Sequence, residues 1–474
     1  MLPRLAPLLV VLAAAPASAD TLWVDPVHGL PWNPGTEAEP LSSVSLALQG
    51  LAAAAGPHVV HLAPGDYSPA SGESFPWAAM DDLVLAGDAD GTLVSVPAGL
   101  ASVFLDGSRA LTLTNIAFEG TRPTRLCSMA AVSAEVTIER CVFTGFGALI
   151  GQVSANQQAR IHVNDSKFYD CVSLGGNLGY AGGNGITSID RCVFDGCEGV
   201  ASGAVFLGTG SNVLISNSVI VRGTHPTNPI GNADYVYGCT IAFNQAPVPR
   251  LEFTISPWIE NCIIAWNGDG STSSVAPGNT VVSCLIHDAA GTDPRSVVPG
   301  PPLFVDGPAG DVRLRFGSPA VDVLPDGADV LDRTGRPRDV DGDLDRTAAG
   351  DLGALELRTL DRPPGAPSVV PLGQPYELEI VGPAWTFSTL AFSRDGLAAS
   401  PAASPYGGIH LAPGAARVRT VGLGSEGRVA FDLPLGGPSS IIGLELGYQA
   451  ITRSFASDTG AAVTNALVLT VGAP

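Results

Sequence analysis

A short sequence phrase recurs between residues 110 and 290, and it constrains the fold more than any other feature of the chain. In each copy an apolar residue, a polar residue and a corner residue precede Cys or Ser, then any residue, then Phe or Ile, as in TIERCVF at 137–143. A repeat of this length indicates one supersecondary unit stacked on itself, which is a solenoid and not a single globular core. The Cys/Ser column falls at Ile116, Cys141, Ser166, Cys192, Ser218, Cys239, Cys262 and Cys284, in steps of 25, 25, 26, 26, 21, 23 and 22 residues.

Each repeat has the pattern of two short strands joined at one sharp corner. Apolar and polar side chains alternate within a copy, as a strand with one buried face requires. The alternation breaks at Asn115, Arg140, Asp165, Arg191, Asn217, Gly238, Asn261 and Ser283. Five of these eight are Asn, Asp or Gly, which accept left-handed backbone angles at low cost. The apolar spacings of three and four that helical repeats need are missing, so we expect coils of about three short strands each.

With these features, residues 55–300 resemble the pectate-lyase-like repeat family, and HVVHLAPGDYS at 58–68 resembles its first coil. The resemblance implies a right-handed parallel β-helix. We therefore expect an all-β protein, namely a right-handed parallel β-helix solenoid with an N-terminal capping helix and a small C-terminal β-sandwich.

The segments outside the repeats divide the chain further. Residues 20–57 form an N-terminal segment and cap: TLWVDPVHGLPWNPGTEAEP resembles the opening of bacterial secreted β-helix proteins, and the apolar residues of 41–51 have helical spacing. The β-helix then covers 58–300. Residues 301–357, with LFVD, GSPAVD and DLGALEL, resemble the module named choice-of-anchor Q, which implies an extracellular or surface-associated protein. A Pro-rich linker at 358–375 precedes short alternating strands at 376–474, which are typical of a β-sandwich.

The first nineteen residues predict export, and the net charge of the chain excludes some classes of binding partner. Arg4, the apolar run LAPLLVVLAAA and Ala17-Ser18-Ala19 fit a secretory signal peptide. No segment is apolar over a length that spans a bilayer, so we expect no membrane insertion. The net charge is −21 and Lys167 is the only lysine, which argues against nucleic acid and anionic lipid as partners. The expected protein is secreted, either extracellular or associated with the cell surface.

The cysteines divide into two groups, and Cys127, which has no obvious partner, belongs to neither. Five of the eight lie in the inward column, where Cys packs as a small hydrophobe. Cys171 and Cys197 each follow their column residue by five positions on adjacent coils. In an exported protein these two are the best candidates for a disulfide.

Aspartates at every second position from 339 to 345 predict a calcium-binding site. Calcium takes six to eight oxygen ligands, and crowded carboxylates do not all stay charged without a cation. The glycine within the row allows a tight turn, but the pattern is not an EF-hand, because the Glu expected at the twelfth position is absent. The alternative is a solvated acidic loop. The candidate ligands of a structural calcium ion are Asp339, Asp341, Asp343, Asp345 and Asp351.

A basic corner gives the one catalytic hypothesis. Arg140 and Arg191 occupy the corner column two coils apart, and Lys167 lies between them in the sequence. β-Helix polysaccharide lyases use a cation to neutralise a uronate carboxylate and Lys or Arg to remove the adjacent proton. These three residues are therefore the catalytic candidates if the protein is a lyase. The alternative is a plain salt-bridge ladder, since Asp165 lies on the intervening coil.

Two polar loops and one apolar strip are candidate interaction surfaces. The Gly- and Asn-rich loops at 175–188 and 223–238 contain the ligand-binding candidates Tyr180, His225, Asp234 and Tyr235, which suit neutral sugar through ring stacking and hydrogen bonds. Ordinary loop decoration is the alternative. The residue after each column Cys or Ser points outward by alternation, yet five of seven are aliphatic, and we expect this strip to pack within the chain. It consists of Val142, Lys167, Val193, Val219, Thr240, Ile263 and Leu285.

The leading functional hypothesis is an exported, non-catalytic β-helix protein that binds a polysaccharide or cell-surface glycan or serves adhesion. The first alternative is a polysaccharide lyase that cleaves a uronic-acid polymer by β-elimination. The second is a purely structural surface protein.

Overall fold

The computed structural model describes the chain from Asp20 to Gly472, with gaps. Residues 1–19 and several further segments lie outside the described part, the longest being 129–134, 152–159, 172–185, 199–211, 246–257, 269–274, 325–330, 343–348, 362–368, 435–444 and 454–460. None of the helices among the described residues is long and apolar enough to cross a membrane.

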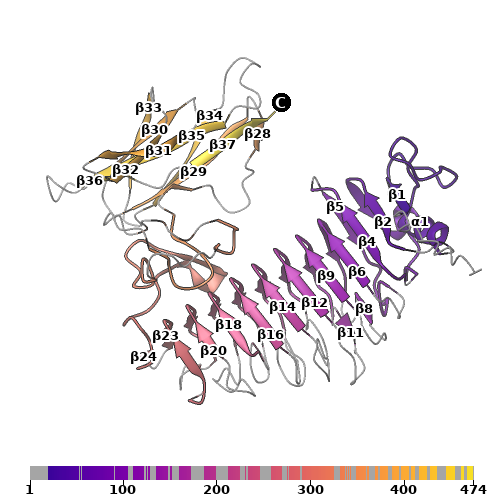
Figure 1. Ribbon diagram of the computed structural model, residues 1–474, viewed down its shortest axis with the longest axis horizontal. Coiled ribbons are helices and arrows are strands. Elements are labelled where there is room, and N and C mark those ends of the chain that lie inside the picture. Colours follow the sequence, from indigo (N-terminus) through magenta and orange to yellow (C-terminus); the bar gives the residue numbers. More distant parts are fainter. Residues whose placement is uncertain are drawn as a thin grey trace, which may run out of the picture.

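The described chain is almost entirely β-structure, and its larger part is a parallel β-solenoid (Figure 1). Two sheets of eleven strands run along it, and each strand pairs in register with its counterparts on the coils before and after it. The first sheet contains β1 (Asp20–Val24), β2 (His58–Leu62), β4 (Leu83–Gly87), β6 (Ala110–Thr114), β9 (Glu135–Glu139), β12 (Arg160–Asn164), β14 (Ile186–Asp190), β16 (Asn212–Ser216), β18 (Tyr235–Tyr237), β20 (Trp258–Glu260) and β22 (Thr280–Val282).

The second sheet contains β3 (Gly65–Tyr67), β5 (Thr92–Ser95), β7 (Ile116–Glu119), β10 (Val142–Thr144), β13 (Lys167–Tyr169), β15 (Val193–Asp195), β17 (Val219–Val221), β19 (Thr240–Ala242), β21 (Ile263–Ala265), β23 (Leu285–Asp288) and the antiparallel β24 (Gly291–Thr292). Two short parallel strands, β8 (Cys127–Ser128) and β11 (Ile150–Gly151), pair with each other outside both sheets. The parallel solenoid that the repeat predicts is therefore observed.

The corner between the two sheets is a left-handed residue on every repeat. All eight predicted corner residues have positive φ, between 47° at Asn217 and 57° at Gly238. A second column of left-handed residues follows the second sheet and was not predicted. It consists of Gly145, Asp170, Gly196, Arg222, Phe243 and Trp266. Bulky residues adopt this conformation at a cost that the surrounding structure must offset.

Identical side chains stack inside the solenoid. The rings of Phe118, Phe143, Phe168 and Phe194 lie face to face, with neighbouring centroids 5.0, 5.3 and 4.7 Å apart. The Cys/Ser column is buried beside them, and its five cysteines are free thiols, as the sequence predicts for core positions. The thiols of Cys141 and Cys192, for example, donate to the backbone carbonyl oxygens two residues earlier, at 3.4 and 3.3 Å. The core is a set of columns along the solenoid axis.

The single α-helix of the described chain lies at the N-terminal end. Helix α1 (Val44–Leu51) is capped by Ser43, whose side chain accepts a hydrogen bond from the Leu46 amide, and it buries Val44, Ala47, Leu48 and Leu51. The Glu73 carboxylate holds the first turn by accepting hydrogen bonds from the amides of Val44 and Ser45, at 2.6 and 3.2 Å. These contacts agree with the helical spacing of the sequence, and the role of α1 as a cap stays a prediction.

Residues 301–357 cover part of the second sheet from outside. This segment contains β25 (Phe304–Asp306), the short 3-10 helix η2 (Gly307–Ala309) and β26 (Asp311–Leu314). Another 3-10 helix, η1 (Pro69–Ser71), lies earlier in the chain, within the solenoid. A separate apolar cluster joins Val219, Ile263 and Leu285 of the outward strip to Leu352 and Ala354. The strip therefore packs within the chain, as predicted, and its partner is the 301–357 segment.

The remaining strands form smaller sheets at the C-terminal end (Figure 1). They are β27 (Leu360–Asp361), β28 (Val369–Pro371), β29 (Pro375–Val381), β30 (Phe387–Ser393), β31 (Leu397–Ser404), β32 (Gly407–Leu411), β33 (Ala416–Gly422), β34 (Arg428–Pro434), β35 (Glu445–Arg453), β36 (Ala461–Val463) and β37 (Leu467–Gly472). They share their own apolar cluster, which includes Leu378, Ile380 and Leu390. Assignment of this region as a β-sandwich stays a prediction.

Candidate functional site

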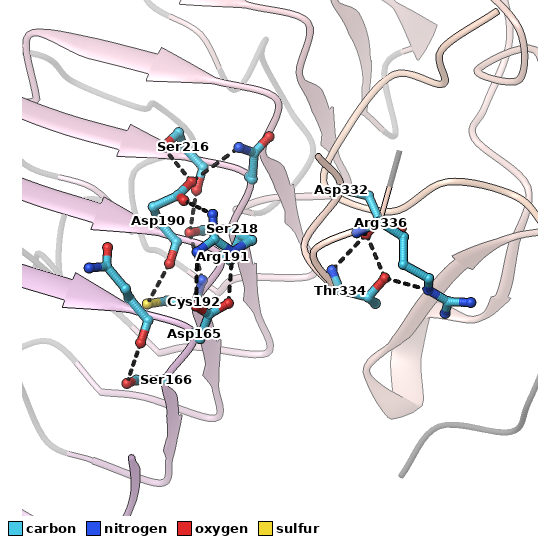
Figure 2. Close-up of polar contacts among 12 residues, drawn as sticks. Asp165, Ser166, Asp190, Arg191, Cys192, Ser216, Ser218, Asp332, Thr334 and Arg336 are labelled. Atoms are coloured by element: carbon cyan, nitrogen blue, oxygen red, sulfur yellow. Dashed lines mark hydrogen bonds and ion pairs between the residues drawn. The ribbon is translucent and has the colours of Figure 1, made fainter. Parts of the chain in front are cut away.

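The basic corner is a ladder of ion pairs. The Arg191 guanidinium donates from Nε and Nη2 to both carboxylate oxygens of Asp165 on the preceding coil, at 2.7 and 2.8 Å, and it also contacts Asp190 (Figure 2). Its pKa is raised, first by the hydrogen bonds to Asp165. Arg140 donates to the Asn115 side chain at 2.7 Å and lies 3.6 Å from Glu139. Arg191 is thus paired with Asp165, as in the salt-bridge alternative, whereas the contacts of Arg140 are with Asn115 and Glu139.

The ladder continues into the 301–357 segment. Asp190 accepts hydrogen bonds from the Ser216 hydroxyl at 2.7 Å and from the Asn217 amide at 3.1 Å. The Asn217 side-chain oxygen in turn accepts from Arg338 at 3.2 Å, and Arg338 also donates to the Asp351 carbonyl. The corner therefore helps to attach this segment to the solenoid.

Among the described contacts, none joins Lys167 to Arg140 or Arg191. It is the first residue of β13, on the outer face of the second sheet, in register with Val142 and Val193. Burial lowers the pKa of its ammonium group, and the Arg333 guanidinium lowers it further. The Lys167 ammonium is thus half-buried on the face of the second sheet that the 301–357 segment partly covers.

The structure describes only two of the four predicted ligand-binding residues. Tyr180 and His225 lie outside the described residues. The Asp234 carboxylate accepts a hydrogen bond from the Val213 amide at 2.8 Å, and its carbonyl accepts one from the Trp258 amide, so this residue aligns neighbouring strands. Tyr235 is the first residue of β18 and lies on the outer face of the first sheet, not in a loop.

Tyr235 belongs to an aromatic platform that sequence reasoning missed. We define the platform as Tyr235, Tyr237, Trp258 and Glu260, with Leu214 at its edge. Leu214, Tyr235 and Trp258 are aligned in register on successive coils, as are Tyr237 and Glu260. One carboxylate oxygen of Glu260 accepts hydrogen bonds from the Tyr235 hydroxyl at 2.6 Å and from the Trp258 indole at 2.9 Å. The rings of Tyr235 and Tyr237 are nearly parallel, with centroids 6.2 Å apart.

The platform is exposed to solvent, and two of its polar atoms are available to bind a ligand. The exposed fraction is 44% for Trp258 and 38% for Leu214. Within the described part of the chain, the Tyr237 hydroxyl and the second Glu260 oxygen have no hydrogen-bond partner. Burial and the Glu260 carboxylate raise the pKa of Tyr235, so its phenol stays protonated. The sequence signal was the 23-residue step from Tyr235 to Trp258, which equals the column step between Cys239 and Cys262.

The acidic candidates are only partly described. Asp339, Asp341, Asp343 and Asp345 lie outside the described residues. Asp351 is buried, and its carboxylate accepts hydrogen bonds from the amides of Asp322 and Leu357. The carboxylates of Asp351, Asp322 and Glu356 offer oxygens within 4.8 Å of one another. Burial raises the pKa of Asp351 to about 8 and the pKa of Glu356 to about 10.

Cys171 and Cys197 are buried free thiols in the structure and not the predicted disulfide. Stacking in register points the two side chains in the same direction, so each thiol has a carbonyl to donate to. The Cys171 thiol donates to the Phe143 carbonyl at 3.6 Å, and the Cys197 thiol donates to the Phe168 carbonyl at 3.5 Å. Their side chains also interact with each other.

Comparisons with known proteins give one partial family match and several solved structures of low similarity. The family described as a protein of unknown function, DUF1565, matches residues 27–146. No curated protein matches the chain. Among solved structures, a rhamnogalacturonan lyase is similar at 11% identity and a TM-score of 0.33, covering 56% of this chain and 87% of the lyase.

Two further solved structures are similar at the same low level. A PL6 family alginate lyase has 14% identity and a TM-score of 0.37, with 60% of this chain covered but only 41% of the lyase. A GH136 lacto-N-biosidase from Eubacterium ramulus has 10% identity and a TM-score of 0.29, with 56% of this chain and 67% of the enzyme covered. At these values the similarities say nothing about substrate or reaction.

Proposed function

We propose that the protein is an exported, non-catalytic β-helix protein that binds a neutral glycan on the aromatic platform of its first sheet. One observation carries the proposal: two tyrosines and a tryptophan lie together on the outer face of adjacent strands, with one glutamate fixing two of them. Sugar rings present apolar faces that stack on such side chains, and their hydroxyl groups are hydrogen-bonded by groups such as Tyr237 and Glu260.

The geometry of a solenoid suits a chain ligand. Adjacent coils lie about 4.8 Å apart, which is roughly the length of one sugar unit. A glycan that runs along the solenoid axis would therefore meet Leu214, Tyr235 and Trp258 in succession, because these residues are aligned in register. Rigid strands hold the rings in place, so binding orders few protein groups.

The charge favours a neutral ligand at this site. The protein has a net charge of −21, and the platform itself contributes a carboxylate and no cation. A polymer rich in carboxylates would be repelled here. A non-catalytic role also accords with the pairing of Arg191, whose guanidinium is engaged by Asp165 through two hydrogen bonds.

The first test removes the indole of the platform. Trp258→Ala is expected to weaken retention in affinity gels that contain neutral polysaccharides by about tenfold, which corresponds to ~1.4 kcal/mol. Trp32→Ala is the matched control, because Trp32 is 76% exposed and far along the chain from the platform. Equal retention of both variants and the wild type would contradict the proposal.

We also propose that the acidic run at 339–345 and Asp351 hold a structural calcium ion. The support is the crowding of Asp351 with Asp322 and Glu356 at the edge of that run. Such carboxylates favour a hard cation, although Arg338 already lies beside them. Chelation is expected to lower the melting temperature by a few degrees, and calcium but not magnesium should restore it. An unchanged melting curve would count against calcium.

A further inference from the structure

The aromatic platform continues along the first sheet as one row of outward side chains. Ser188 lies on the coil before Leu214 and is aligned with it in register, and His162 is aligned with Ser188 in the same way one coil earlier. Both are partly exposed and are next to buried residues on their strands, so their side chains project from the outer face. Figure 1 shows the five strands that carry the row, β12, β14, β16, β18 and β20, side by side. We define the outward row as His162, Ser188, Leu214, Tyr235 and Trp258.

The polar end of the outward row is a hydrogen-bonded pair. Nδ1 of His162 lies 2.7 Å from the Ser188 hydroxyl oxygen. This contact orients the imidazole ring, and its Nε2 atom has no hydrogen-bond partner in the part of the chain that the structure describes. A histidine ring nitrogen either donates or accepts a hydrogen bond, depending on the tautomer. The pair can therefore bind sugar hydroxyl groups, while Tyr235 and Trp258 stack on the faces of sugar rings.

The spacing of the outward row suits an extended chain of sugars. Its five residues lie on successive coils, so the row spans four steps of about 4.8 Å, or about 19 Å in all. Because the coils stack in register, the row follows the solenoid axis, and a glycan bound along it must rise by about one sugar per coil. Chains of β-1,4-linked glucose or mannose are extended and meet this condition, whereas chains of α-1,4-linked glucose curve away.

The charges beside the outward row favour a neutral glycan. A parallel row of outward residues contains three carboxylates and no cation. It consists of Glu139, Asn164, Asp190, Ser216, Tyr237 and Glu260. Carboxylate and amide groups bind the hydroxyl groups of a neutral sugar, but the carboxylates repel a uronate.

We propose that the outward row is a single binding site for a linear, β-1,4-linked neutral oligosaccharide of about five sugars, one for each coil. Tyr235 and Trp258 stack on sugars at one end, Leu214 contacts a ring face at the centre, and the His162–Ser188 pair binds hydroxyl groups at the other end. This inference rests on the proposed glycan binding and adds the linkage and the length of the ligand.

The test measures the Kd of the full chain for cello-, manno- and malto-oligosaccharides, from the disaccharide to the hexasaccharide, by calorimetry. Affinity for the cello or the manno series should rise with length up to about the pentasaccharide. The malto series should bind at least about tenfold more weakly, because its curved chain leaves the row.

The decisive variant is His162→Ala. It is expected to raise the Kd for the hexasaccharide about fivefold, because a hydrogen bond is lost. The Kd for the trisaccharide should stay unchanged, since a trisaccharide reaches only Leu214, Tyr235 and Trp258. His28→Ala is the matched control, because the His28 side chain is 80% exposed and lies far along the chain from the outward row.

The outcomes separate this inference from the proposed function. Unchanged binding of the trisaccharide shows that His162→Ala is folded. If Trp258→Ala weakens hexasaccharide binding and His162→Ala does not, the platform binds glycan without the rest of the row, and this inference alone is overturned. Equal affinity for the malto series, or no gain in affinity beyond the trisaccharide, would overturn it too. Binding of none of the three series would also overturn it, and the affinity gels would then decide the proposed function separately.

Discussion

At the scale of single residues, the protein buries polar groups where stacking or a neighbouring segment can satisfy them. Column serines, for example Ser166 and Ser218, accept from the amides of the preceding coil and donate to a carbonyl of their own coil. In the 301–357 segment, by contrast, two acidic side chains, Asp351 and Glu356, lie close together in the interior. Two buried carboxyl groups in contact favour their protonated forms.

The pH dependence of stability should follow from this pair. Burial raises the folded-state pKa of Glu356 to about 10 and that of Asp351 to about 8, whereas both carboxyls titrate near pH 4 when unfolded. The folded state therefore holds protons that the unfolded state releases, so their contribution is complete below pH 4 and is lost as the pH rises to about 10. Glu356→Gln keeps an acceptor for the Asp351 amide and removes the charge.

We expect Glu356→Gln to be more stable than the wild type at pH 9, by at least about 1 kcal/mol, with a smaller difference at pH 6. Urea unfolding at the two pH values, without added calcium, measures the free energy of unfolding. The same pH slope in both proteins would show that Glu356 does not hold the extra proton.

At the scale of elements, the column of stacked phenylalanines inside the solenoid packs each coil against the next. Phe168 is fully buried and stacks on Phe143 and Phe194. Phe168→Ala is expected to reduce the free energy of unfolding by about 3–5 kcal/mol, because it removes a ring and leaves a cavity. Val142→Ala, on the outer face of the neighbouring strand, should cost much less. Chemical denaturation measures both, and equal losses would refute the role of the column.

The sequence predicted elements well where the pattern was local. The first corner column was recognisable because Asn, Asp and Gly recur in it, and its residues do adopt positive φ. The second corner was not, because Arg222, Phe243 and Trp266 are not residues that favour this conformation. Likewise Tyr235 was noticed as a loop residue, but its partner Trp258 belongs to the next coil, and only the register of β18 and β20 brings the two together.

At the scale of the whole molecule, the two long sheets have different roles. The second sheet receives the 301–357 segment over its later strands, which buries the apolar strip. That segment contacts the C-terminal strands through Arg313, which donates to Glu379 at 2.9 Å, while Arg428 pairs with the same carboxylate at 3.1 Å. The predicted packing within the chain was right, but no local pattern indicates which distant segment supplies it. The first sheet carries the platform on its outer face, with Trp258 exposed to solvent.

The most direct test of the account is binding of the purified chain to an array of neutral and uronate-rich glycans, alongside Trp258→Ala and Trp32→Ala. The account predicts binding to neutral glycans by the wild type and Trp32→Ala, with binding weakened about tenfold in Trp258→Ala. Undiminished binding by Trp258→Ala, or no binding to any neutral glycan, would contradict the assignment of the aromatic platform as the functional surface.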